Sequence, residues 1–139
     1  MLRTSPSDID AYLYWKADES ADLESIRDRL LRRGPTSAAM AAGKALHKAL
    51  ELADDGPKVI MEADGYRFHF PLDAQLALPE IRELKASKVY QIGDHEFRMV
   101  VVTDALHGLR VEDHKTTSRY DAEKYLSTYQ WRFYLDVFE

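Results

Sequence analysis

The stretch VVVTDALHGLRVEDHKTT, residues 100–117, decides the fold. It begins inside a run, Met99–Val102, that is rich in β-branched residues and is therefore typical of a buried strand. Gly108 favours a turn, and Leu109–Lys115 is predicted to form the returning strand. We therefore predict a β-hairpin whose first strand covers Glu96–Ala105.

This hairpin is expected to gather three charged side chains at one end of the strand pair. Asp104 ends the first strand, and Asp113 and Lys115 lie on the second. Side chains alternate between the two faces of a strand, so Asp113 and Lys115 should share a face. The short turn should bring Asp113 to within about one residue of register with Asp104. Two carboxylates with a carbonyl between them suit Mg²⁺ or Mn²⁺, and a neighbouring ammonium can hold a water or stabilise developing charge.

The same residues have a plainer interpretation. Asp-x-Lys is a short pattern, and a group of charges at a strand end is usually a solvated edge. A second register would use Glu112 as the acid, but Glu112 and Lys115 would then face opposite sides of the strand. By itself the hairpin fits both a catalytic site and an α/β domain with a solvated strand end.

The rest of the chain predicts helices first, then short strands, and finally another helix. Capping residues and apolar spacing predict helices after Ser5, over Ala21–Arg33, from Thr36 or Ser37 to about Asp54, and over Tyr120–Phe138. Further strands are predicted at Lys58–Met61 and Tyr66–Phe70, around an Asp64-Gly65 turn, and at Ile81–Ile92. Pro71–Pro79 gives no clear pattern. This order predicts one domain, residues 1–139, in which helices pack on a mixed sheet.

Two helices carry polar pairs four residues apart, a spacing that places both members on one helix face. The third helix carries Gly43 and His47, and the last carries Gln130 and Tyr134. A glycine inside a helix costs about 1 kcal/mol relative to alanine, and here it is expected to clear space beside the imidazole. The simpler alternatives are a packed histidine and an ordinary polar helix face.

Taken together, four segments resemble motifs of the RecB-type branch of the PD-(D/E)XK nuclease superfamily, in the same order. The segments are GKALHKALE (43–51), VVVTDAL (100–106), VEDHKTT (111–117) and YQWRFY (129–134). They match a G-x-x-x-H helix, an aspartate on one strand followed by D-x-K-T on the next, and a Q-x-x-x-Y helix. The start, Ser5-Pro6-Ser7, is also similar to the S-x-S start of the family. The resemblance covers residues 4–138 and implies a restriction-endonuclease-like fold, an α/β fold with a mixed β-sheet flanked by helices.

The resemblance also implies a role for each matched residue. The implied metal ligands are His47, Asp104, Asp113 and the backbone carbonyl of His114. Lys115 would be the catalytic lysine, and Gln130 and Tyr134 would support that lysine or the bound phosphate. These roles imply Mg²⁺- or Mn²⁺-dependent hydrolysis of DNA phosphodiester bonds by an exonuclease of recombination or repair, similar to phage enzymes. The alternative is a catalytically silent RecB-like domain that binds DNA or a protein partner.

The chain departs from the family pattern at several points. Val101 stands where a glycine usually precedes the first strand aspartate. Many relatives bind an iron–sulfur cluster through cysteines, but this chain has no cysteine and carries Tyr14-Trp15 where Cys-Pro would be expected. We therefore expect no iron–sulfur cluster. Relatives usually continue with more sheet, so the chain is expected to be either a minimal version or a C-terminally truncated one.

Charge and hydropathy limit the partners. The formal net charge is −5, which argues against passive coating of nucleic acid. Residues 27–48 nevertheless hold six basic residues and one acid, and the predicted DNA-binding set is Arg27, Arg32, Arg33, Lys44 and Lys48. An ordinary solvated helix face is the equally weighted alternative. No apolar run approaches the roughly 20 residues of a membrane span, and no secretory signal is visible. We expect a cytoplasmic location in a bacterium or a phage-infected cell. The sequence leaves open the oligomeric state, the polarity of digestion and whether the substrate is DNA or RNA.

Overall fold

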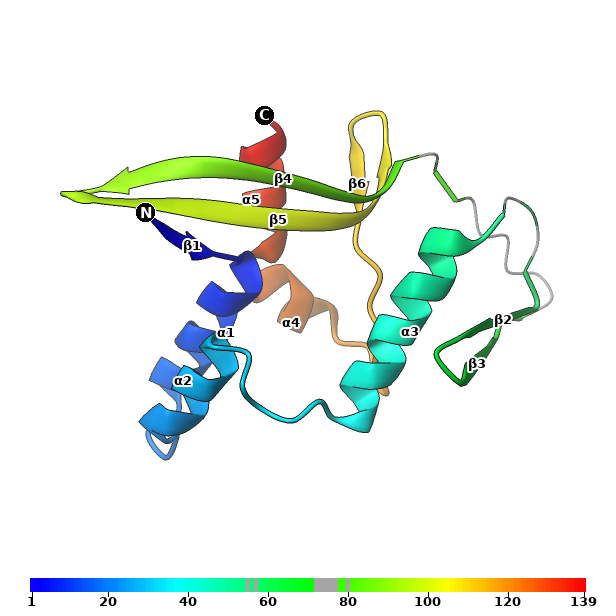
Figure 1. Cartoon of the computed structure of the whole chain (residues 1–139), viewed down its shortest axis with the longest axis horizontal. Coiled ribbons are helices and arrows are strands. Elements are labelled where there is room, and N and C mark those ends of the chain that lie inside the picture. Colours follow the sequence, from blue (N-terminus) through cyan, green and yellow to red (C-terminus); the bar gives the residue numbers. More distant parts are fainter. Residues whose placement is uncertain (55, 57, 72–77, 80) are drawn as a thin grey trace. The chain divides into compact units, whose positions relative to one another are not determined.

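The computed structural model describes residues 1–54, 56, 58–71, 78–79 and 81–139. These residues form two compact units (Figure 1). The first unit contains residues 1–35, 85–102 and 120–139, and the second contains residues 36–84 and 103–119. Two long strands, β4 (Ile81–Ile92) and β5 (His95–His107), contribute residues to both units. Residues 72–77 of the unassigned Pro71–Pro79 segment lie outside the described part of the chain.

The first unit begins with a short strand and two helices. Strand β1 (Leu2–Thr4) pairs in parallel with β5, Leu2 facing Phe97 and Thr4 facing Met99. Helix α1 (Pro6–Ala17) starts at Ser5, whose backbone N–H donates to the Asp8 carboxylate at 3.0 Å in a capping box. Helix α2 (Leu23–Leu30) follows. The sequence predicted both helices, although α2 is shorter than Ala21–Arg33, and it did not predict β1.

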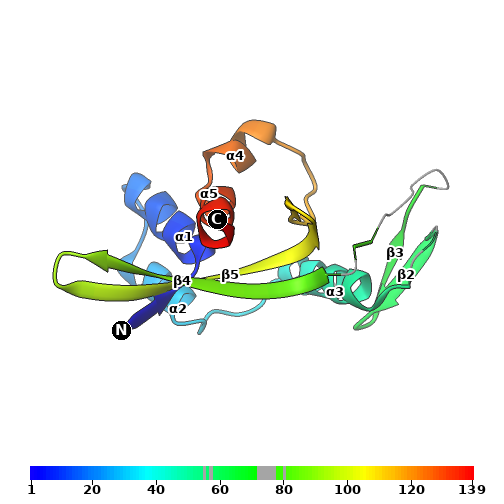
Figure 2. The same cartoon turned by 90° about the horizontal axis from the view of Figure 1, so that it is seen from above.

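The second unit is built on helix α3 (Ala38–Leu52), which begins at the predicted cap Ser37. Strands β2 (Ile60–Ala63) and β3 (Tyr66–His69) form the predicted hairpin beside α3 (Figure 2). Asp64 and Gly65 both have positive φ, 49° and 81°, as a two-residue hairpin turn favours. Ala49, Leu50 and Met61 are buried between α3 and this hairpin, and they form the core of the unit.

Strand β5 carries the buried run that the sequence indicated. Met99, Val101, Thr103 and Ala105 are at most 1% exposed, whereas Val102 is 41% exposed. Strand β4 is hydrogen-bonded to β5, and β6 (Arg110–Glu112) pairs with β5 in antiparallel fashion. Because β1 is parallel to β5 and β6 is antiparallel, the sheet is mixed, and helices flank it. The predicted α/β class is confirmed at this level.

The predicted last helix is two helices, α4 (Ala122–Ser127) and α5 (Gln130–Phe138). The break lies at Thr128, which is extended, and the Thr128 hydroxyl donates to the Tyr125 carbonyl at 2.8 Å. The Tyr129 N–H donates to the Asp10 carboxylate of α1 at 2.8 Å rather than to its own helix. The prediction of one continuous helix over Tyr120–Phe138 was wrong because a local contact of Thr128 and a long-range contact of Tyr129 with Asp10 hold the backbone outside a helix.

Helix α5 is fixed to β5 through Tyr134, which is only 5% exposed. The Tyr134 hydroxyl donates to the Val102 carbonyl at 2.9 Å, and the Gln130 side-chain amide donates to that hydroxyl at 2.6 Å. Tyr90 of β4 packs edge-on against Phe133, and the Lys88 ammonium lies 3.0 Å from the Asp136 carboxylate. Within the described residues, no helix is both long enough and apolar enough to cross a membrane.

Removal of the Tyr134 hydroxyl should destabilise the protein. Tyr134→Phe leaves the partly buried Val102 carbonyl and the Gln130 amide without that partner, which should cost about 1–2 kcal/mol of unfolding free energy. Urea unfolding measures the difference. Tyr120→Phe is the control because Tyr120 is 76% exposed, and an equal effect of both substitutions would contradict a specific role for the Tyr134 hydroxyl.

Candidate metal centre

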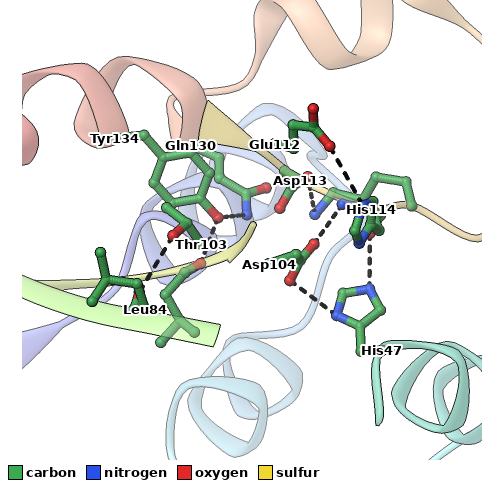
Figure 3. A network of polar contacts seen from close by, with 11 residues as sticks. His47, Leu84, Thr103, Asp104, Glu112, Asp113, His114, Gln130 and Tyr134 are labelled. Atoms are coloured by element: carbon green, nitrogen blue, oxygen red, sulfur yellow. Dashed lines mark hydrogen bonds and ion pairs between the residues drawn. The ribbon is translucent and has the colours of Figure 1, made fainter. Parts of the chain in front are cut away.

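Helix α3 presents His47 to two other segments of the second unit. The His47 Nδ1 atom lies 3.1 Å from Asp104 Oδ1, and Nε2 lies 2.8 Å from the His114 carbonyl oxygen (Figure 3). Three residues that the motif order had singled out therefore meet, although His47 is far from the other two in the sequence. Both atoms that face the ring are acceptors, so both contacts are hydrogen bonds only when the imidazole carries two protons.

Asp104 holds the chain that follows β6. Its second carboxylate oxygen accepts a hydrogen bond from the His114 backbone N–H. The last paired residues of β5 and β6 are Ala105 and Glu112, so the same register places Asp104 opposite Asp113. The predicted proximity of these two positions agrees with this register.

The second strand is shorter than predicted. Leu109–Lys115 was expected to be extended in the sheet, but β6 ends at Glu112. The reason is that the His114 N–H donates to the Asp104 side chain, which ends the backbone ladder at that point. Asp113 and Lys115 still point toward each other, as the spacing predicted, since the Lys115 ammonium lies 2.6 Å from the Asp113 carboxylate.

Glu83 is the residue that the sequence analysis missed. One ligand atom from each of His47, Glu83 and Asp104 lies within 4.8 Å of the others. Among the described residues, this is the one group of three acidic or histidine side chains that could hold a metal ion. Asp113 is not part of the group. Nothing in the sequence distinguishes Glu83 from any other acid in an expected strand.

The backbone around Glu83 explains how it reaches the group. Glu83 has φ of 50°, a left-handed conformation that is uncommon for a side chain other than glycine and that interrupts the alternation of a strand. The preceding residue, Arg82, donates to the carbonyls of Leu50 and Glu51 at the end of α3, at 3.1 and 3.0 Å. This contact fixes the start of β4 against the helix that carries His47.

The charges of the group act on one another. The hydrogen bond with Asp104 raises the pKa of His47 above its ordinary value, against the opposite effect of partial burial. Burial by itself raises the pKa of Asp104, but hydrogen bonds from His47 and from the His114 amide outweigh it and hold that pKa below its usual range. Burial and then the Asp104 charge raise the pKa of Glu83. The group is thus an ion pair with a second carboxylate beside it.

The donor set fits a hard divalent cation. Carboxylate and carbonyl oxygens suit both Mg²⁺ and Mn²⁺, and the imidazole favours Mn²⁺. His47, Glu83, Asp104 and His114 also line a small pocket, together with Leu50 and Pro79 among others. A cation bound to His47 requires one ring nitrogen to lose its proton and its present hydrogen bond, so metal and proton compete for that nitrogen.

Gly43 makes room for a different side chain from the expected imidazole. A Cβ atom at this position would lie 3.0 Å from the Thr116 hydroxyl oxygen. The space that the missing side chain leaves is therefore taken by Thr116, one residue after Lys115, and not by the imidazole. The glycine permits the chain after β6 to approach α3 closely.

The remaining predicted residues are divided between the two units. Gln130 and Tyr134 belong to the first unit, where they bind each other and Val102, and their support of Lys115 stays a prediction. The basic residues are also divided: Arg27, Arg32 and Arg33 lie in the first unit, and Lys44 and Lys48 in the second. Arg32 pairs with Asp8 at 2.7 Å and Lys48 pairs with Asp64 at 2.5 Å, so two of these charges are already neutralised.

No family model, curated protein or solved structure matches the chain. The mixed α/β architecture is therefore established by the structure itself. Membership of the RecB-type branch rests on the order of the sequence motifs and stays a prediction.

The His47–Asp104 pair should make the stability of the metal-free protein depend on pH. Since the pKa of His47 is higher in the folded protein, its protonation favours folding. This contribution is complete below about pH 6.5, the ordinary value, and is lost as the pH rises through the folded-state pKa. Urea unfolding in EDTA should show wild type losing its advantage over His47→Gln as the pH rises from about 5 to 9.

The control for this titration is His69→Gln, which removes an exposed imidazole from β3. A stability difference between wild type and His47→Gln that stays constant across the pH range would contradict the ion pair.

The contact between Gly43 and Thr116 can be tested by a double-mutant cycle. Alanine is about 1 kcal/mol better than glycine inside a helix, so Gly43→Ala should show that gain when Thr116→Ala removes the obstructing hydroxyl. With Thr116 in place the gain should be smaller or reversed. Urea unfolding of the four proteins measures this, and equal effects in both backgrounds would show that the contact carries no energy.

Proposed function

We propose that the protein is a divalent-metal-dependent nuclease that hydrolyses phosphodiester bonds of DNA. The observation that carries this proposal is the meeting of His47, Asp104 and the His114 backbone in one half-buried cluster. These are residues that the motif order had selected. The Asp113–Lys115 ion pair is attached to the same cluster through His114. A merely solvated strand end would not require His47 to lie against Asp104.

The chemistry follows from the charges in the cluster. A bound divalent cation would polarise the scissile phosphate. His47, Asp104 and the His114 carbonyl would hold it, and Asp104 would also keep His114 in place through its amide. The Lys115 ammonium would position the attacking water and offset the negative charge that develops on the phosphate. Asp113 orients that ammonium by its ion pair.

DNA is the proposed substrate because residues 27–48 hold six basic residues and one acid, a charge that suits a phosphate backbone. Arg27, Arg33 and Lys44 are the members of the predicted binding set that contribute no ion pair named above, and they lie on or beside helices of the two units. An exonuclease of recombination or repair is the form of the activity that the motif order favours.

The activity is tested with end-labelled linear DNA and circular DNA, each with Mg²⁺, Mn²⁺ or EDTA. We expect cleavage with either metal and none in EDTA. Degradation of linear DNA alone would identify an exonuclease, whereas cleavage of circles would identify an endonuclease. Binding of DNA without cleavage under every condition would contradict the proposal and favour a silent scaffold.

Lys115→Ala should abolish cleavage and leave divalent-metal binding within a few-fold of wild type, since an ammonium is not a metal ligand. Calorimetric titration with Mn²⁺ and the cleavage assay measure the two properties. Lys85→Ala removes an exposed lysine of β4 and is the control. Cleavage by Lys115→Ala at the wild-type rate would show that the Asp-x-Lys assignment is wrong.

A further inference from the structure

Glu83 places a second carboxylate beside Asp104. Its side chain is half-buried, and its ligand atom lies within 4.8 Å of those of His47 and Asp104. Among the described residues, no hydrogen bond or ion pair holds the Glu83 carboxylate. Asp104, by contrast, already accepts hydrogen bonds from His47 and from His114. Two adjacent carboxylates repel each other unless a cation lies between them, so the pocket has an excess of negative charge that a divalent ion would balance.

Asp113 has a different environment. One of its carboxylate oxygens lies 2.6 Å from the Lys115 ammonium; the Asp113 side chain is 23% exposed and the Lys115 side chain 39%. The Lys115 ammonium already balances the charge of the Asp113 carboxylate, so a cation gains less there than at the Glu83 carboxylate, which no ion pair among the described residues balances. Asp113 also lies outside the group that His47, Glu83 and Asp104 form.

We propose that Glu83, and not Asp113, is the third side chain that binds the metal, and that Asp113 is the positioning residue of Lys115. This inference rests on the proposed function because it concerns the same metal centre. It changes the ligand set that the sequence motifs imply: His47 from α3, Glu83 from β4 and Asp104 from β5 bind the ion, with the His114 carbonyl. The Asp113–Lys115 pair then forms a separate element that acts on water and phosphate.

The test compares Mn²⁺ binding and DNA cleavage by the full-length wild type, Glu83→Gln and Asp113→Asn. Mn²⁺ alone is the probe, and calorimetry measures its affinity. Glu83→Gln should weaken Mn²⁺ binding by more than about tenfold, because loss of a group that only supports a metal ligand already costs at least about that much. Asp113→Asn should keep affinity close to wild type yet slow DNA cleavage strongly, and the slowed cleavage should have an altered pH profile because Lys115 has lost its counterion.

Two further variants guard against an unfolding artefact. Glu51→Gln removes a carboxylate that lines the same pocket and acts on Glu83 through its charge but lies outside the group, so it should weaken Mn²⁺ binding much less than Glu83→Gln. Glu83→Asp keeps a carboxylate and should bind Mn²⁺ more tightly than Glu83→Gln. Thermal unfolding in EDTA confirms that each variant is folded.

The outcomes separate this inference from the proposed function. Stronger loss of Mn²⁺ affinity in Asp113→Asn than in Glu83→Gln overturns the inference, even if wild type cleaves DNA. The expected ranking of affinities without any DNA cleavage supports the ligand set and overturns the nuclease. If wild type binds no Mn²⁺, the inference is overturned. The proposed function is then decided by the cleavage assay alone.

Discussion

The second unit depends on the hydrogen bonds of one carboxylate. Asp104 accepts from the His47 ring with one oxygen and from the His114 amide with the other, so a single side chain joins a helix, a strand and the segment after the next strand. Strand β6 has only three residues and contributes few ladder bonds. The position of the Asp-x-Lys segment is therefore set by a side chain more than by strand pairing, and the loss of those donors would leave a buried charge without compensation.

Local signals were strong enough to predict most elements. Ser5 and Ser37 begin helices because their side chains can satisfy free backbone N–H groups, and Asp64-Gly65 forms its turn because both residues accept positive φ. The predictions failed where a long-range contact replaced a local one. The last helix is broken beside a contact with Asp10, and β6 ends where Asp104 captures an amide. The first strand, Leu2–Thr4, is too short to carry a pattern and exists because β5 offers it a parallel edge.

The candidate site was predictable to the same extent. His47, Asp104 and His114 could be selected from the sequence because each lies in a motif with a helix or strand around it, and the structure brings them together. Glu83 could not be selected from the sequence. Its approach to His47 and Asp104 depends on a positive φ, a backbone conformation that a glutamate in a strand does not predict. Arg82 adds to this, because its contacts with the end of α3 are made only when two distant segments have already packed. A left-handed residue in a strand costs on the order of 1–3 kcal/mol, a cost that the surrounding contacts must offset.

The close approach of Thr116 to Gly43 couples the substitutions that two positions distant in the sequence can accept. A larger side chain on the helix at position 43 can be accommodated only if the residue after Lys115 becomes smaller or the segment moves outward. Substitutions at the two positions are therefore constrained as a pair rather than singly. Among sequences that share this arrangement, a change at one position should be accompanied by a compensating change at the other, and such covariation would mark the contact without any further structure.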